Sequence, residues 1–390
     1  MTEKLRVQNN AHPVTRILVI SDAAPHRNGV GAYYADLIDE LSPYVERAEL
    51  VSPEVIGDKW QGGWMLPLPG DATQKFCLPN GFELSRKIRS FKPTVVVIPT
   101  PGLYGLMGAM VARRYGIKVI VGFHTWFEKL ASLYWSRVQG GITRTYLDVV
   151  NKSLFRLADQ VLANSDEMVG IARRMGAEKV DLMGTPLGQS LINTPVRKVP
   201  KKIQSVLFVG RLAAEKNLEA VIEAARACPD MTFNIAGDGP ERKAIEQLAR
   251  GVANVNLLGW VGREQIVGLI DQHDALVLPS KVESFGTVAM EAMVRERLVF
   301  VSAACGICAW PELRKGLVVV EEHSSLGAEL ARYKALSEFE IHSSCFTARK
   351  VALQHIRWNR ELWLSCTQRE GSDNQRSPVY RSLIHKTIRG

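Results

Sequence analysis

Residues 275–293 read ALVLPSKVESFGTVAMEAM, and this stretch decides which fold to expect. Its first part, Ala275–Leu278, is apolar and is followed by Pro279, which is typical of a buried strand that ends there. A polar loop and then a helical pattern follow. A loop that leaves the carboxyl end of a parallel strand and enters a helix is where α/β folds bind ligands. The stretch therefore predicts a parallel α/β sheet with a binding loop at its edge.

The same alternation of apolar strands and helical segments extends through the second half of the chain. The other strand-like runs in this half are 205–210, 232–236, 255–259, 298–302 and 317–320. Apolar strands separated by helices indicate a parallel sheet that is covered on both faces. We therefore predict one α/β domain from this half alone.

The first half of the chain repeats the pattern independently. Its apolar runs are 16–20, 94–98, 118–123 and 160–164, and helical spacing is present over 32–41 and from about 127 to 157. Residues 184–201 interrupt the pattern with prolines, glycines and basic residues, as an interdomain linker does. Because 390 residues exceed what one hydrophobic core usually serves, two domains are expected.

The predicted domain bounds follow from these patterns. We expect a mobile tail over 1–14, a first Rossmann-like domain over 15–190 and a second over 191–346. A helix over 347–368 comes next, and the polar, basic residues 369–390 are expected to be disordered.

Composition suggests a soluble protein of a reducing compartment. Hydrophobic residues make up 46% and charged residues 23% of the chain, and no apolar stretch is long enough to span a bilayer. The polar start Met1–Lys4 has no apolar segment behind it, so no signal peptide is expected. The six cysteines are scattered, which favours the cytoplasm.

The net charge of +9 is unevenly distributed. Between Arg86 and Phe155 there are eleven lysines and arginines, and the only acidic residues are Glu128 and Asp148. A basic face attracts an anionic partner, either membrane headgroups or nucleic acid. A merely solvated surface is the alternative.

The loop after Ala275–Leu278 carries the strongest functional signal. Residues Ser284, Phe285, Gly286 and Thr287 would aim backbone N–H groups at an anion at the helix N-terminus. Glu283 lies in the loop and Glu291 about two turns into the helix, so the two carboxylates can bind different parts of one ligand, such as a sugar and a ribose. The alternative is a surface helix that merely carries acids.

Two further loops follow strands of the same predicted sheet. The segment 208–217 (FVGRLAAEKN) places Gly210, Arg211 and Lys216 at a strand exit, where two cations suit a diphosphate. The segment 235–241 (IAGDGPE) contains Gly237, which permits a tight turn close to a ligand. Three strands therefore deliver such loops to one edge of one sheet.

These three segments resemble the family-4 glycosyltransferases of the GT-B fold. The patterns G-R-x-x-x-x-K, A-G-D-G-P and E-S-F-G-x-x-x-x-E-A-M match that family in order and approximate spacing, most clearly from Ser205 to Met293. The resemblance implies two Rossmann-like domains facing each other across a deep cleft, with a C-terminal helix that crosses back to the first domain. It also implies a nucleotide-sugar donor, either a UDP-sugar or a GDP-sugar.

The resemblance also implies roles for single residues. Arg211 and Lys216 would neutralise the leaving diphosphate, Glu283 would hold hydroxyls of the donor sugar, and Glu291 would hold those of the ribose. Residues 285–287 would present amides to the phosphates, and the nucleotide base would pack on 258–261, which includes Gly259, Trp260 and Val261. Enzymes of this kind retain the anomeric configuration and need neither a metal nor another cofactor.

A mechanism follows from the placement of charge. Negative charge grows on the β-phosphate as the glycosidic bond breaks, and fixed cations and N–H donors stabilise it most in the transition state. No side chain is an obvious nucleophile. We therefore expect attack on the front face, with the departing phosphate accepting the proton of the acceptor hydroxyl.

The first domain is expected to carry the acceptor. Gly29 and Gly31 resemble the glycine-rich loop with which the family contacts the donor diphosphate. His124, followed by Thr125, is similar to a His-Thr pair in members that glycosylate lipids, and it could bind the transferred sugar. A histidine that is satisfied inside the fold is the alternative.

Aromatic and basic residues alternate after His124 and suit the interface of an anionic membrane. We predict that this segment contacts lipid and that the enzyme is peripheral on the inner face of the cytoplasmic membrane, with a lipid acceptor and no nucleic-acid partner. A core helix with a basic outer face is the alternative. The predicted residues are Trp126, Phe127, Lys129, Tyr134, Trp135 and Arg137.

Some positions depart from the family pattern. Glu296 and Leu298 stand where the family usually has glycine and proline, Gln189 and Ser190 replace part of a linker motif, and Cys305–Cys308 replaces a Gly-Gly turn. The Cys-x-x-Cys spacing has no second pair, which argues against zinc. Two rival functions remain open, a nucleotide-sugar epimerase on the same fold and a non-enzymatic module that binds membrane or nucleic acid.

Overall fold

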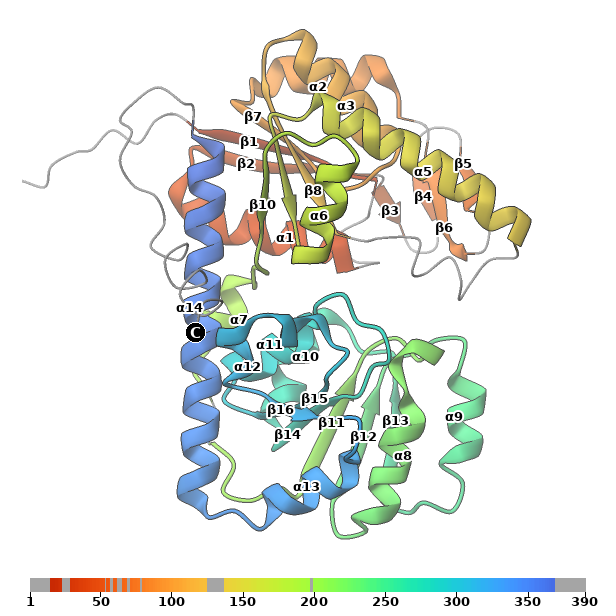
Figure 1. The fold of residues 1–390 in the computed structure, drawn as a ribbon, viewed down its shortest axis with the longest axis vertical. Coiled ribbons are helices and arrows are strands. Elements are labelled where there is room, and N and C mark those ends of the chain that lie inside the picture. The colour runs from red at the N-terminus through yellow and green to blue at the C-terminus, as the bar shows by residue number, and fades with distance from the viewer. Residues whose placement is uncertain are drawn as a thin grey trace, which may run out of the picture. The chain divides into compact units, whose positions relative to one another are not determined.

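The chain forms two compact units in a computed structural model (Figure 1). The structure describes residues 15–22, 29–52, 54–56, 59–61, 65–68, 71–77, 79–124, 137–196 and 199–368. Unit 1 comprises Met1–Ala163, Val169–Met183 and Asn359–Gly390, and unit 2 comprises Asn164–Met168 and Gly184–Trp358.

Unit 1 is built on a six-stranded parallel sheet. Its strand order is β10-β9-β8-β7-β1-β2, so the order reverses between β1 and β7. The strands are β1 (Arg16–Ile20), β2 (Arg47–Val51), β7 (Val95–Ile98), β8 (Lys118–Phe123), β9 (Gln160–Ala163) and β10 (Val180–Leu182). Two separate hairpins, β3 (Glu54–Ile56) with β4 (Lys59–Gln61) and β5 (Met65–Leu68) with β6 (Asp71–Cys77), lie between β2 and β7 in the sequence.

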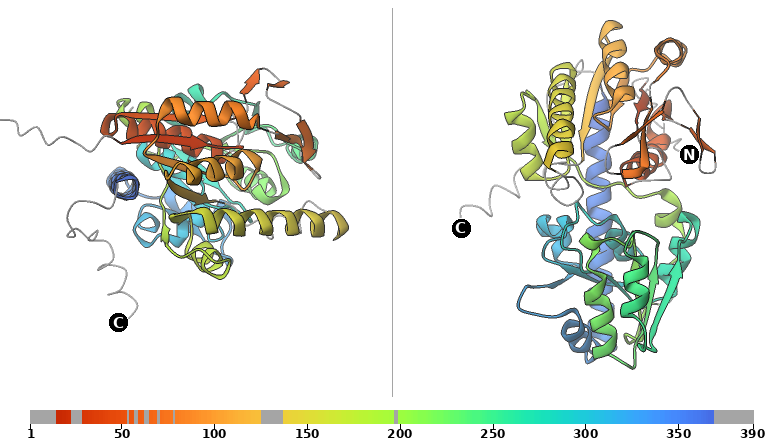
Figure 2. Two further views of the ribbon diagram at one scale, coloured as in Figure 1. Left: turned by 90° about the horizontal axis from the view of Figure 1, so that it is seen from above. Right: turned by 90° about the vertical axis from the view of Figure 1, so that its right-hand side faces the viewer.

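Helices connect these strands and cover the sheet (Figures 1 and 2). Asn80 caps the start of α2 (Gly81–Phe91), because its side chain accepts the N–H groups of Phe82 and Glu83, which are otherwise unsatisfied donors at a helix start. The helical segments are α1 (Gly29–Leu41), η1 (Ser42–Tyr44), α2 (Gly81–Phe91), α3 (Leu103–Arg114), α5 (Arg137–Leu157) and α6 (Asp166–Arg174).

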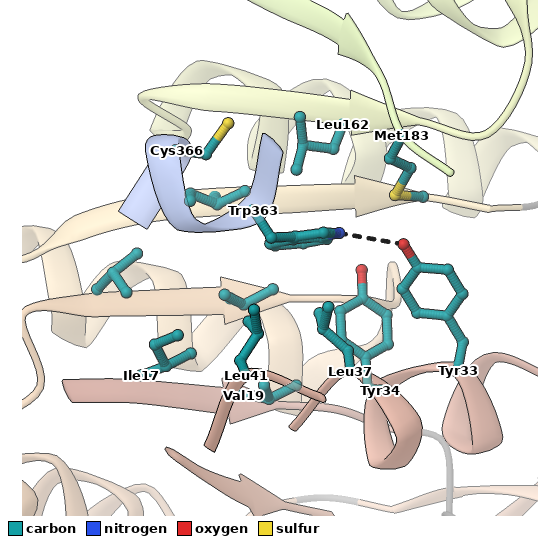
Figure 3. Packing of buried hydrophobic residues seen from close by; sticks show 13 residues of the cluster. Ile17, Val19, Tyr33, Tyr34, Leu37, Leu41, Leu162, Met183, Trp363 and Cys366 are labelled. Atoms are coloured by element: carbon teal, nitrogen blue, oxygen red, sulfur yellow. Dashed lines mark hydrogen bonds between the residues drawn. The ribbon is translucent and has the colours of Figure 1, made fainter. Parts of the chain in front are cut away.

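The core of unit 1 includes a residue from the far end of the chain (Figure 3). Trp363 is completely buried and its indole N–H donates to the hydroxyl of Tyr33 at 3.2 Å. Its ring also meets that of Tyr34 edge-on, with the centroids 6.1 Å apart. An indole buried in this way contributes both a large apolar area and a satisfied polar group, so the last helix is an integral part of this core.

Unit 2 has a second six-stranded parallel sheet, with the order β13-β12-β11-β14-β15-β16. This is the Rossmann order, and it reverses between β11 and β14. The strands are β11 (Ser205–Val209), β12 (Thr232–Ala236), β13 (Val255–Gly259), β14 (Ala275–Leu278), β15 (Leu298–Ser302) and β16 (Val318–Val320).

The helical segments of unit 2 alternate with these strands. They are α7 (Gln189–Asn193), η2 (Ala214–Lys216), α8 (Leu218–Ala227), α9 (Arg242–Leu248), α10 (Arg263–Asp271), α11 (Thr287–Val294), η3 (Gly306–Ala309), α12 (Pro311–Arg314) and α13 (Leu326–Lys334). The last helix, α14 (Glu338–Thr367), belongs to unit 2 up to Trp358 and to unit 1 from Asn359. The predicted fold class, α/β with two Rossmann-like parallel sheets, is therefore confirmed.

The last helix is longer than its sequence pattern suggested. α14 begins at Glu338 rather than near residue 347. A capping box explains the early start, because Ser337 Oγ accepts the N–H of Glu340 at 3.3 Å while the Glu340 carboxylate accepts the N–H of Ser337 at 2.8 Å. Residues 1–14 and 369–390, for which tails were predicted, lie outside the described part of the chain.

Two arginines that flank the departure at Glu296 have a structural role. The side chains of Arg295 and Arg297 are buried around Asp271, and Arg295 Nη2 lies 2.6 Å from its carboxylate. Arg295 also donates to the carbonyls of Thr194 and Pro195 at 2.6 and 2.8 Å. The predicted linker region is therefore fastened to unit 2 by an arginine, where the family pattern gave no reason to expect one.

Glu296 adopts the left-handed conformation, with φ of 55°. It ends α11 in a Schellman motif, because the N–H of Glu296 bonds the carbonyl of Met293 and the N–H of Arg297 bonds that of Ala292. Glycine adopts this conformation without a steric penalty, which explains why the family pattern has glycine here.

We predict that Glu296→Gly is more stable than Glu296→Ala by about 1 kcal/mol, the usual cost of a side chain in this conformation. Both changes remove the 3.5 Å pair with Arg349, so their difference isolates the backbone strain. The midpoints of urea unfolding measure it. Equal midpoints would show that Glu296 is not strained.

Candidate functional site

The exits of β11 and β14 form the candidate site of unit 2. The two strands are neighbours at the point where the strand order reverses, and the carboxyl ends at such a point are where open α/β sheets bind ligands. Their loops are bonded together, because the carbonyl of Glu215 accepts the N–H groups of Lys281 at 2.7 Å and Val282 at 3.4 Å. Asn217 Nδ2 adds a bond to the carbonyl of Pro279 at 3.2 Å.

The structure brings Lys216 and Glu283 into direct contact. Lys216 Nζ lies 2.5 Å from Glu283 Oε2, and each side chain is only 17% exposed. Arg211 precedes Lys216 on the same loop and is exposed. The two loops therefore carry exposed cations, Arg211 and Lys281, and an ion pair that is largely shielded from solvent.

A third loop supports this pair from the exit of β15. The N–H groups of Gly306 and Ile307 donate to the carbonyls of Glu283 and Phe285 at 2.9 and 2.8 Å. A Cβ on Gly306 would lie 2.0 Å from the carbonyl oxygen of Ser284, a distance that real Cβ atoms do not show. Only glycine therefore lets the two loops approach so closely.

Gly286 sets where the following helix begins. Its φ of 95° is left-handed, so the helical conformation starts only at Thr287, and Glu291 lies one turn into α11. The expected two turns were too many, because the left-handed Gly286 delays the start of the helix to Thr287. Ser284 and Thr287 are exposed, whereas Phe285 is buried.

Phe285 packs against His355, which no sequence pattern indicated. The His355 ring stacks on that of Phe285 at 5.9 Å and meets Trp310 edge-on at 4.6 Å. Its Nε2 accepts the N–H of Thr185 at 3.2 Å, and burial lowers the pKa of His355 to about 3. His355 is therefore neutral and acts as a buried acceptor. No local motif identifies it, because its partners lie far away in the sequence.

The glycines predicted to bind a ligand pack against each other. The N–H of Gly237 donates to the carbonyl of Gly259 at 2.7 Å, and a Cβ on Gly237 would lie 1.8 Å from the carbonyl oxygen of Gly210. Close packing of the chain thus already requires glycine at 237. Trp260 follows directly, with 76% of its surface exposed, and Val261 is half-buried.

In unit 1, His124 lies at the end of β8 in an aromatic cluster. Its Nε2 is 3.0 Å from the Tyr34 hydroxyl, and its ring meets those of Tyr33 and Tyr34 edge-on at 4.6 and 5.2 Å. Burial lowers the pKa of His124 to about 3. The imidazole is therefore neutral at physiological pH and can exchange hydrogen bonds without supplying a positive charge.

The predicted glycine-rich loop of unit 1 is partly helical. Gly29 and Gly31 belong to the first turn of α1, where Gly29 is exposed and Gly31 is buried. A further acid was missed at the exit of β1. Asp22 accepts the N–H groups of Tyr104 and Gly105 at 2.9 and 3.1 Å, so it already occupies the N-terminus of α3. Burial raises the pKa of Asp22 above its ordinary value.

The predicted lipid-contacting residues lie outside this description. Trp126, Phe127, Lys129, Tyr134 and Trp135 fall within 125–136, and only the backbone of Arg137 is described, as the first residue of α5. In the described part of the chain, no helix is both long and apolar enough to cross a membrane.

The Cys305–Cys308 pair gives no metal site. The Cys305 thiol donates to the carbonyl of Leu278 at 3.3 Å and that of Cys308 to Ser302 at 3.6 Å. Burial raises the pKa of both thiols, that of Cys308 to about 11. Among the described residues, no group of three or more His, Cys, Asp or Glu side chains is arranged to hold a metal ion.

Two family models match the chain, one for each half. The model of glycosyl transferases group 1 matches residues 193–337, and the model of Glycosyltransferase Family 4 matches residues 27–185. Together they cover most of the chain, and both describe glycosyltransferases rather than epimerases.

Individual proteins are similar over parts of their length. Alpha-D-kanosaminyltransferase of Streptomyces kanamyceticus is 44% identical over 99 residues, which are 24% of this chain and 26% of that protein. Sulfoquinovosyl transferase SQD2 of Arabidopsis thaliana is 23% identical over 287 residues, 70% of this chain and 55% of that protein. The matches thus span between a quarter and just over half of these relatives.

The fold has relatives among solved structures. HepE of Anabaena, in complex with UDP and glucose, superposes with a TM-score of 0.65 at 17% identity and covers 91% of this chain and 100% of its own. At this identity the likeness shows the fold alone.

We predict that Gly306→Ala destabilises unit 2 by about 1–3 kcal/mol, the cost of forcing an atom into a packed site. Gly268→Ala in α10 is the matched control, because nothing lies within 4 Å of the added Cβ. Chemical unfolding followed by tryptophan fluorescence measures both variants. Equal stability of the two variants would show that the 283–285 loop can move to accommodate the added Cβ at little cost in free energy.

Proposed function

We propose, on the premise that this chain belongs to the family-4 glycosyltransferases of the GT-B fold, that it transfers a hexose from a UDP-sugar or GDP-sugar to the hydroxyl of a membrane lipid or glycolipid precursor. In this proposal the transfer retains the anomeric configuration and needs no metal. The protein works as a peripheral enzyme on the inner face of the cytoplasmic membrane.

One observation carries the proposal, the contact between Lys216 and Glu283 at the strand reversal of unit 2. A nucleotide sugar joins an anionic diphosphate to a neutral sugar rich in hydroxyl groups. A cation and a carboxylate side by side match these two chemistries at their junction, since the cation attracts phosphate and the carboxylate accepts hydrogen bonds from hydroxyl groups. The exposed Arg211 adds a second cation for the diphosphate.

In this proposal the other predicted donor residues bind the rest of the nucleotide. Glu291, one turn into α11, holds the ribose hydroxyls, and the amides of residues 285–287 face the phosphates. The exposed Trp260 offers an aromatic surface on which a base can stack, and Val261 adjoins it. Glucose and UDP bound to HepE are consistent with such a donor, although they were observed on that protein.

The proposed chemistry is a substitution at the anomeric carbon. The bond from that carbon to the β-phosphate oxygen breaks, and the acceptor oxygen forms the new bond on the same face. The acceptor proton moves to the departing phosphate oxygen. Arg211 and Lys216 stabilise the negative charge that develops on this phosphate, which lowers the barrier.

His124 is proposed to hydrogen-bond the transferred sugar from unit 1. Because its pKa is lowered to about 3, it is neutral from pH 5 to pH 8 and its charge does not change across that range. Gly29 and Gly31 would allow the start of α1 to approach the donor diphosphate.

We predict that UDP or GDP binds the wild type without added metal and that Glu291→Ala weakens this binding by about tenfold or more, the effect of losing a charged hydrogen bond. Glu223→Ala, an exposed acid of α8, is the control and keeps the wild-type affinity. Isothermal titration calorimetry measures both and identifies the base. If neither UDP nor GDP binds, the non-enzymatic alternative is favoured.

We also predict that Arg211→Ala or Lys216→Ala lowers kcat by about a hundredfold, the scale of losing one charge-stabilising donor. Lys243→Ala, an exposed cation of α9, should leave kcat unchanged. The rate of hydrolysis or transfer is measured as the release of UDP or GDP from the nucleotide sugar. Normal turnover in both site variants would remove the diphosphate assignment.

A further inference from the structure

Three neighbouring helices of unit 1 each expose one large apolar side chain. Phe82 of α2 is 73% exposed, Met110 of α3 is 58% exposed and Val149 of α5 is 58% exposed. The helices lie side by side over the sheet, in the order α2, α3, α5 (Figures 1 and 2).

Each apolar side chain shares a helical stripe with exposed cations. In α2 the stripe is Phe82, Arg86 and Arg89, and in α5 it is Val149, Lys152 and Arg156. In α3, Arg114 lies one turn beyond Met110. Residues three, four and seven apart project from the same side of a helix. We call these eight residues together the α2–α3–α5 face.

The three helices are held against one another in pairs. The sulfur of Met107 in α3 lies 2.8 Å from where a Cβ on Gly81 would be, which sets the start of α2 beside the middle of α3. The far end of α3 is tied to the end of α5, because Arg113 Nη1 donates to Asp159 at 2.8 Å. The start of α2, where Phe82 lies, is therefore in contact with α3 one turn before Met110.

Charge is strongly asymmetric within unit 1. The helices α2, α3 and α5 contain nine lysines and arginines and only two acids, the exposed Glu83 and the half-buried Asp148. Helix α1 contains three acids and no lysine or arginine. These three helices are therefore much more basic than α1.

Stabilisation of helix ends explains only part of this pattern. Arg89, Arg114 and Arg156 lie in the last turns of their helices, where a cation is favoured by the helix dipole. That effect does not explain an exposed phenylalanine, methionine and valine beside them. Apolar tips flanked by arginine and lysine are instead the combination that binds the headgroup region of an anionic bilayer.

We infer that the α2–α3–α5 face docks on an anionic membrane, with Phe82, Met110 and Val149 entering the headgroup region and the five cations binding lipid phosphates. The inference rests on the proposed function for its purpose, because a lipid acceptor requires the enzyme at a membrane. Helix α5 begins at Arg137, the last residue of the segment that the sequence predicted to contact lipid.

Co-sedimentation of the full chain with vesicles tests this docking. The vesicles contain equal parts of phosphatidylglycerol and phosphatidylcholine, and pure phosphatidylcholine vesicles serve as the uncharged comparison. One variant combines Phe82→Ser, Met110→Ser and Val149→Ser, and a second combines Arg86→Gln, Arg114→Gln and Lys152→Gln. The control combines Phe339→Ser and Phe346→Ser, which are 81% and 66% exposed on α14 within unit 2.

We expect the wild type to bind the anionic vesicles and not the neutral ones, and each face variant to bind at least tenfold more weakly, with the control unchanged. Wild-type affinity in both face variants would overturn the assignment, as would equal loss in the control. Tight binding of duplex DNA that the charge variant abolishes, with no vesicle binding, would make the face a nucleic-acid surface.

Nucleotide titration separates this inference from the proposed function. Both face variants should bind UDP or GDP as the wild type does, which also shows that they are folded. Vesicle binding without any nucleotide binding would sustain the docking face and reject the transferase proposal. Nucleotide binding without vesicle binding would reject the docking face and leave the transferase proposal standing.

Discussion

The parallel pairing of β11 with β14 is the constraint on which the candidate site depends. Val206 pairs with Ala275 and Leu207 with Leu276, although about seventy residues separate the strands. This register places the loop of Arg211 and Lys216 beside the loop of Glu283. A change of strand order would leave the same residue types in the chain but separate the cations from the carboxylate.

Backbone contacts then hold the loops at that edge. The carbonyl of Glu215 fixes the start of the 281–286 loop, and Gly306 fixes its middle. The His355 ring, from the last helix, stacks on the ring of Phe285. Loops are usually the mobile parts of a fold, but here each is bonded to another loop or to the last helix. The side chains are thus presented by a backbone that is already ordered.

The sequence was sufficient for features that are encoded locally. Apolar runs such as Val95–Ile98 and Ala275–Leu278 are buried strands at the predicted places. The edge strand β2 was missed because it carries Arg47 and Glu49 and is only partly buried, so no apolar run marks it. The capping box at Ser337 was present in the sequence, but it does not precede an apolar run of clear periodicity.

The long-range features of the site could not be read in this way. Lys216 and Glu283 are 67 positions apart, and the sequence predicted separate roles for them but not their contact. His355 and Thr185 are 170 positions apart. Such contacts depend on which strands become neighbours and on where the last helix packs. Residue type and spacing along the chain do not contain that information.

The burial of Trp363 has a consequence for how the protein is made. A ribosome completes the strands and helices of unit 1 up to Met183 long before it reaches residue 363, and nascent domains generally fold in order of synthesis. Unit 1 must therefore wait with Tyr33 and Tyr34 incompletely covered until the whole of unit 2 has been translated. The first half of the chain is finished by its last helix, so the two halves mature together rather than in succession.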